Sequence, residues 1–198
     1  GLWDEPLSAV SNGAFIIAAI FAFILARKEN AINWRSSLLI ALIFAMGVGS
    51  TLFHTFATVW AMLMDILPIL TYQIVFIAVY AQRVMNIHCA KSSAILALFF
   101  VAMYVSMQLP REWLNGSLEY APALIFVTGL GIWHVRNVAR EKWALLAAAC
   151  VFTVSLTFRS IDMAVCEVLP IGVHYIWHVL NAIVLYLTAR GYILNAKV

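Results

Sequence analysis

The chain has 198 residues, of which 65% are hydrophobic and only 11% are charged, and its mean hydropathy is +0.96. A soluble domain is nearer half apolar and a quarter charged, so this composition excludes an ordinary soluble protein and indicates a polytopic membrane protein. The net charge of +3 does not indicate nucleic-acid binding, because the basic residues are spread over the connections between apolar segments.

Apolar segments recur along the chain at roughly the length that crosses a bilayer as a helix, about 17–25 residues. They lack the two-residue alternation of a membrane barrel, so we expect an all-α fold. In chain order the segments span residues 8–26, 37–56, 59–80, 92–109, 120–135, 143–158 and 171–187. No repeat or linker divides them, which predicts a single seven-helix transmembrane domain over residues 1–198.

The basic residues are distributed unevenly between the two sides that this topology defines. Only Arg111 and Arg159 fall on the side of the amino terminus. By the positive-inside rule, we expect the amino terminus outside or in a lumen and the carboxyl terminus in the cytosol. The basic residues on the cytosolic side are Arg27, Lys28, Arg35, Arg83, Lys91, Arg136, Arg140, Lys142, Arg190 and Lys197.

Three histidines lie near the outer ends of their segments. His174 and His178 open the last segment four residues apart, which places them above one another on one helix face. That spacing lets two imidazoles share one zinc ion, and histidine inside a membrane helix indicates a function by default. His54 ends the second segment near the same membrane face. Three histidines with an open fourth position form a catalytic zinc site, so we expect these residues to be the ligands. The alternative is that the histidines only hydrogen-bond to a neighbouring helix.

Two more polar residues lie at the same depth. Ser50 is one turn from His54, and Asp65 is about two turns into the third segment. An unpaired carboxylate in a bilayer is unfavourable, so Asp65 is a candidate proton carrier, or it orients a ligand histidine. Ser50 is placed to donate to an oxyanion or to hold a bound water. The alternative is that Ser50, with Gly47 and Gly49, only permits close helix packing.

Other charged or polar residues have simpler interpretations. Arg159 and Asp162 lie three residues apart at the outer end of the sixth segment, where they form an ion pair that shapes the loop or else support the site. His88 and His134 fall on the cytosolic side and are expected to be ordinary interfacial residues. A retinal-binding pump requires a lysine in the last segment, and the lysines all lie in loops or the tail.

The combination of these motifs resembles the alkaline ceramidase family, from Glu5 to about Tyr186. The resemblance implies a seven-helix intramembrane hydrolase that cleaves the amide bond of ceramides to a sphingoid base and a fatty acid. It also implies that zinc is bound by the histidines and that Ser50 and Asp65 are the catalytic partners. The matching motifs are Glu5-x5-Ser11-Asn12, Gly49-Ser50-x-x-Phe53-His54, Asp65-x-x-Pro68, Arg159-x-x-Asp162-x-x-x-Cys166 and His174-x-x-x-His178.

The resemblance also bears on calcium, substrates and location. The amino-terminal loop of the family supplies oxygen ligands for Ca²⁺, and Glu5 matches one of them. The expected partners are the lipid bilayer and a ceramide-like lipid, in a bacterial inner membrane or an internal eukaryotic membrane. Two alternatives are a receptor-like seven-helix zinc protein and a hydrolase or remodelling enzyme of another lipid class, because zinc-activated water attacks esters as well as amides.

Overall fold

The chain folds into a bundle of helices, as expected where a bilayer offers no hydrogen-bond partners to the backbone. The computed structural model describes residues 6–166, 169 and 171–196, and within them there is no strand. A kinked 3-10 segment, η1, whose residues 114–116 have positive φ, precedes α6. The elements are α1 (Pro6–Ser11), α2 (Gly13–Lys28), α3 (Trp34–Phe56), α4 (Val59–Arg83), α5 (Cys89–Met107), η1 (Trp113–Tyr120), α6 (Ala121–Asn137), α7 (Ala144–Cys166) and α8 (His174–Asn195).

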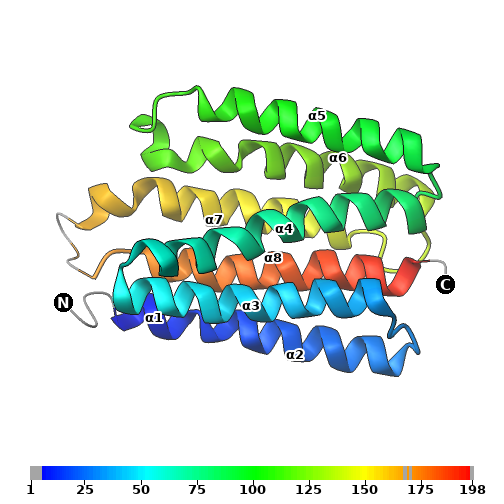
Figure 1. Cartoon of the computed structure of the whole chain (residues 1–198), viewed down its shortest axis with the longest axis horizontal. Helices are drawn as coiled ribbons and strands as arrows, with labels where there is room; N and C mark the ends of the chain where they lie inside the picture. The colour runs from blue at the N-terminus through cyan, green and yellow to red at the C-terminus, as the bar shows by residue number, and fades with distance from the viewer. Residues whose placement is uncertain (1–5, 167–168, 170, 197–198) are drawn as a thin grey trace.

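The long helices lie side by side along the longest dimension of the molecule (Figure 1). Helix α8 is central: it packs on α7 and α2 and also touches α1 and α3. Helix α3 packs extensively on α4, while α5 and α6 form the opposite edge of the bundle. This arrangement brings the end of α3, the start of α4 and the start of α8 to the same end of the molecule.

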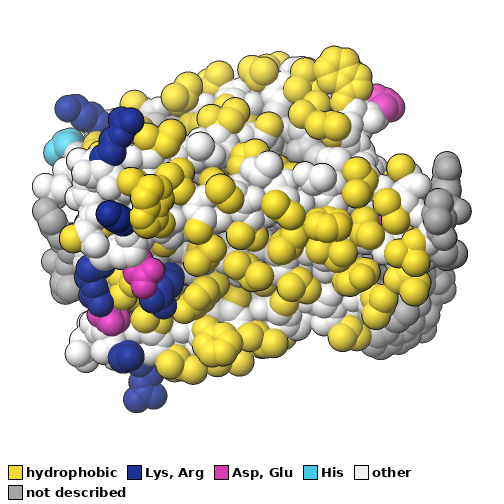
Figure 2. All heavy atoms as spheres, turned by 180° about the vertical axis from the view of Figure 1, so that it is seen from behind, with side chains coloured by type: hydrophobic (Ala, Val, Ile, Leu, Met, Phe, Trp, Pro, Cys, Tyr) yellow, Lys and Arg dark blue, Asp and Glu magenta, His cyan; other side chains and the backbone are white. Residues whose placement is uncertain are grey.

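The prediction of an all-α protein with membrane-spanning helices is confirmed in its main part. Among the described residues, six helical stretches are long and apolar enough to cross a membrane, by length and composition. Helix α8 has 22 residues and lies in the same bundle, but it contains histidines, Asn181 and Arg190, which reduce its hydropathy. Hydrophobic side chains cover the length of the bundle and Lys and Arg gather at one end (Figure 2), as expected of a protein surrounded by lipid.

Several element boundaries differ from the sequence-based expectation. Helix α7 continues to Cys166, eight residues beyond the predicted end at 158, and two polar residues of this stretch, Arg159 and Asp162, line the cavity between the helices rather than a loop. The first predicted helix is divided at Asn12, whose buried side chain donates to the Ser8 carbonyl oxygen at 2.9 Å. Asn12 keeps helical backbone angles, so α1 leads into α2, and α1 contacts α3 and α8.

The prediction that His134 is an interfacial residue is wrong. Its side chain is fully buried, its Nδ1 atom is hydrogen-bonded to the Tyr80 hydroxyl, and its Nε2 atom lies 3.3 Å from the Glu141 carbonyl oxygen. His88, by contrast, is exposed and caps the start of α5. The same end of the bundle is joined by an ion pair of 2.8 Å from Arg140 to Glu29, which lowers the pKa of the Glu29 carboxyl.

Candidate metal centre

The three histidines predicted as ligands lie together, although they come from two helices. His54 is in the last turn of α3, and His174 and His178 are in the first turns of α8. One ring nitrogen from each lies within 4.8 Å of the others. Two nitrogens bound to one zinc ion are separated by at most about 4.2 Å, since each bond is about 2.0–2.1 Å. The donor set would therefore fit zinc after a small closure, and all three histidines line one cavity.

The tautomer of His178 follows from its hydrogen bonds to α1. Its Nδ1 atom lies 2.9 Å from the Ser11 hydroxyl oxygen and 3.1 Å from the Ser8 carbonyl oxygen. The Ser11 hydroxyl donates its own hydrogen to the same carbonyl, so both oxygens act as acceptors toward the ring. Nδ1 must therefore hold the proton, and Nε2 keeps the lone pair that a metal requires.

Asp162 fixes the start of α8, where His174 lies. One carboxylate oxygen accepts a hydrogen bond from the Val173 backbone N–H at 2.6 Å, and the other lies 4.0 Å from His174 Nδ1. Gly172 has φ +66°, and a Cβ atom there would lie 2.7 Å from the carboxylate. Of the two sequence-based alternatives, the geometry favours support of the site over an ion pair with Arg159.

Close packing of α3 on α4 places Ser50 beside Asp65. A Cβ atom on Gly49 would lie 2.0 Å from the Met64 carbonyl oxygen, so the two backbones are nearly in contact there. Pro68 lacks the N–H that would bond to this carbonyl, which leaves it free to face α3. Ser50 is buried, and its hydroxyl is close enough to the Asp65 carboxylate to donate a hydrogen bond to it.

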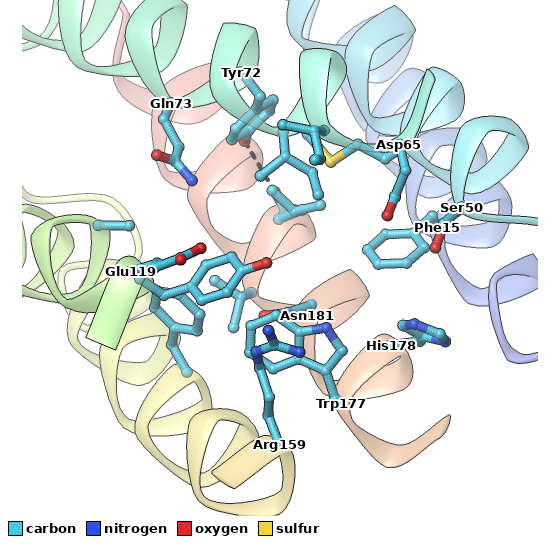
Figure 3. A pocket seen from close by; sticks show the side chains of 18 of the residues that line it. Phe15, Ser50, Asp65, Tyr72, Gln73, Glu119, Arg159, Trp177, His178 and Asn181 are labelled. Carbon is cyan, nitrogen blue, oxygen red and sulfur yellow. Dashed lines mark hydrogen bonds between the residues drawn. The ribbon is translucent and has the colours of Figure 1, made fainter. Parts of the chain in front are cut away.

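A cavity of about 530 Å³ contains the five predicted site residues and extends inward between the helices. That volume is in the range of small-molecule sites, about 300–1,000 Å³. Beyond the histidines the walls are largely apolar, and a hydrogen bond of 2.8 Å between Tyr72 and Thr188 lies farther along the cavity. Figure 3 shows the side chains of Ser50, Asp65 and His178 on one side of the cavity and those of Arg159 and Glu119 across from them. The apolar lining includes Ile69, Phe76, Phe99, Phe126, Val127, Leu130 and Val184.

Fold and site together define a helical protein suited to a membrane, with three clustered histidines beside a largely apolar cavity. The Ceramidase family model matches residues 4–195, so the chain belongs to this family. This membership implies an amide hydrolase that acts on a membrane lipid. A search of curated proteins found no match.

The structure therefore brings together Ser50, His54, Asp65, His174 and His178, as the depth of each residue in its segment predicted. Glu5, the predicted calcium ligand, lies outside the described residues. Sequence reasoning gave Ser11 only through the family motif and missed its contact with His178, as well as the carbonyl of Ser8. These contacts join helices distant in the chain, so no local pattern indicated them.

Proposed function

We propose that the chain is a zinc-dependent hydrolase that cleaves the amide bond of ceramide-type membrane lipids to a sphingoid base and a fatty acid. One observation supports this function above all others. A cluster of three imidazoles, a serine and a carboxylate faces one largely apolar cavity in a chain of the Ceramidase family. Each of these groups has a role in hydrolysing an amide, and none is needed to pack apolar helices.

The roles follow from the chemistry of each group. His54, His174 and His178 would hold the metal through one nitrogen each. Zinc bound there would lower the pKa of water toward neutrality and polarise a carbonyl oxygen. Asp65 accepts a proton from the attacking water as its oxygen bonds to the carbonyl carbon, and passes it to the leaving nitrogen as the C–N bond then breaks. The Ser50 hydroxyl donates a hydrogen bond to the oxyanion that develops.

The surroundings decide which substrate enters and from where. The apolar walls of the cavity accept hydrocarbon chains, and exposed apolar side chains on the outer surface favour entry from the bilayer. We propose one domain over residues 1–198, in a bacterial inner membrane or an internal eukaryotic membrane, with the metal centre near the outer or lumenal face. Ca²⁺ binding through Glu5 belongs to the same proposal and requires the complete amino-terminal loop.

The test is hydrolysis of ceramide and a matched ester lipid by purified protein, with metal content measured on the same sample. We expect ceramide cleavage that stops on chelation and returns with zinc. Cleavage of the ester alone would assign the site to another lipid class. One zinc per chain without turnover of either lipid would contradict the proposed hydrolase activity and favour a receptor-like protein.

A further inference from the structure

Arg159 places a cationic side chain in the wall of the cavity. It comes from α7, and its guanidinium carbon lies 5.1 Å from the ring centre of Tyr120 and 5.4 Å from that of Trp177. In Figure 3 the side chain extends from α7 across the cavity from Ser50 and Asp65. Asp65 and His178 line the same cavity. The guanidinium is therefore near the proposed reaction centre but on the opposite wall.

The neighbouring elements hold Arg159 in this position. The Asn115 side chain donates to the Arg159 carbonyl oxygen at 3.1 Å, and the hydroxyls of Ser160 and Ser117 are hydrogen-bonded at 2.9 Å. These bonds fix η1 on α7. The two aromatic rings attract the cation further. Because its position is set by these contacts, the guanidinium needs little reorganisation to bind a ligand.

The hydrogen-bonding capacity of Arg159 is unused within the described part of the chain. Its Nε atom is buried there without an acceptor, and no described carboxylate lies within ion-pair distance of it. A guanidinium has five N–H donors and no acceptor. A ligand that binds it must therefore present oxygen atoms to the cavity.

We propose that Arg159 is a specificity-determining residue that donates hydrogen bonds to the hydroxyl group of the lipid's polar head. This inference rests on the proposed function. A ceramide has its hydroxyls close to the amide nitrogen, so an amide beside Ser50 and Asp65 brings them toward the opposite wall. The hydrocarbon chains then occupy the apolar part of the cavity, and Arg159 fixes the register of the amide against the metal centre.

The experiment compares ceramide with a matched analogue that lacks the primary hydroxyl, in wild-type protein and in Arg159→Met. We expect kcat/KM of the variant for ceramide to fall about 10–100-fold, since a hydrogen bond from a charged donor is lost. For the analogue we expect less than about a 3-fold change. Arg159→Lys, which keeps a charged donor, is expected to restore part of the preference for ceramide.

If Arg159 had a merely structural role, Arg159→Met would lower kcat/KM for both substrates by the same factor, and that result would overturn the inference. The matched control is Arg136→Met, which removes an exposed arginine on α6. It is expected to leave the ratio of kcat/KM for ceramide to kcat/KM for the analogue unchanged. If wild-type protein cleaves neither lipid, the proposed function fails. In that case the affinity of each protein for ceramide and for the analogue is measured by displacement of a fluorescent ceramide. Equal affinities of wild type and Arg159→Met for both lipids would overturn this inference as well.

Discussion

At the scale of single residues, the proposed mechanism separates metal binding from proton transfer. His178 is a proposed ligand, whereas Asp65 faces the same cavity without belonging to the histidine cluster. Substitution of His178 should therefore affect zinc content, whereas substitution of Asp65 should affect turnover alone. The assignment of roles can be tested by measuring both quantities on purified variants.

Asp65→Asn is expected to keep one zinc per chain and to lower kcat about 10²–10⁴-fold, because the amide cannot accept the water's proton. His178→Ala is expected to lose both zinc and turnover. Metal analysis and ceramide hydrolysis on the same samples distinguish these outcomes. Turnover by Asp65→Asn close to that of wild type would remove this residue from the mechanism.

A second prediction concerns the serine that holds His178. Ser11→Ala removes one of the two acceptors of the Nδ1 proton, while the Ser8 carbonyl oxygen remains. We expect zinc affinity to fall about 10-fold, at the lower end of the effect of residues that orient ligands. Competition with a chelator measures the affinity, and Ser37→Ala on the exposed face of α3 is the control. Equal affinities of wild type and Ser11→Ala would show that this hydroxyl does not orient the ring.

At the scale of helices, Gly49 sets the distance between α3 and α4. Gly49→Ala places a methyl group 2.0 Å from the Met64 carbonyl oxygen, which belongs to the backbone and cannot rotate away. The helices must separate, and Ser50 then moves away from Asp65. We expect a loss of about 1–3 kcal/mol in the free energy of unfolding, and reduced turnover.

The matched control for this prediction is Gly129→Ala in α6, where nothing lies within 4 Å of the added methyl group. Alanine favours a helix over glycine, so this variant should be neutral or more stable by up to about 1 kcal/mol. Thermal unfolding in detergent compares the two variants. Equal stabilities would mean that the α3–α4 contact adapts to a larger residue.

The positions of residues along their helices show how much of the site could be predicted from the sequence. The spacing of His174 and His178 and the depth of Ser50, His54 and Asp65 in their segments were enough to predict that they meet, because helices convert sequence distance into depth. Asp162 was placed at the same end of the bundle as the histidines, but its contact with the start of α8 depends on how helices pack against each other. That packing has no signature in a single segment.

The error at His134 has a similar cause. Position along the chain placed it at the cytosolic end of a segment, where an exposed side chain is the ordinary expectation. In the bundle, however, α4 provides the Tyr80 hydroxyl as a partner, and the imidazole is fully buried. Position along the helix was therefore predictable, whereas the direction in which a side chain faces required the arrangement of the other helices.

At the scale of the whole molecule, charge asymmetry predicts that the proposed metal centre lies at the outer or lumenal face. The cysteines test this orientation. Cys89 begins α5 and is exposed, and the predicted topology places it on the cytosolic side. Cys150 is also exposed, but it lies inside the apolar stretch of α7, where lipid would surround it.

In sealed vesicles of known orientation, a membrane-impermeant maleimide should label Cys89 only when the cytosolic face is accessible. A variant with Cys89 as its single cysteine isolates this signal, and one that keeps only Cys150 should react little from either side, because a water-soluble reagent does not reach a thiol in lipid. Labelling of Cys89 from the outer face would invert the topology. The metal centre, at the opposite end of the bundle, would then face the cytosol, and the source of its water and the exit of its products would change with it.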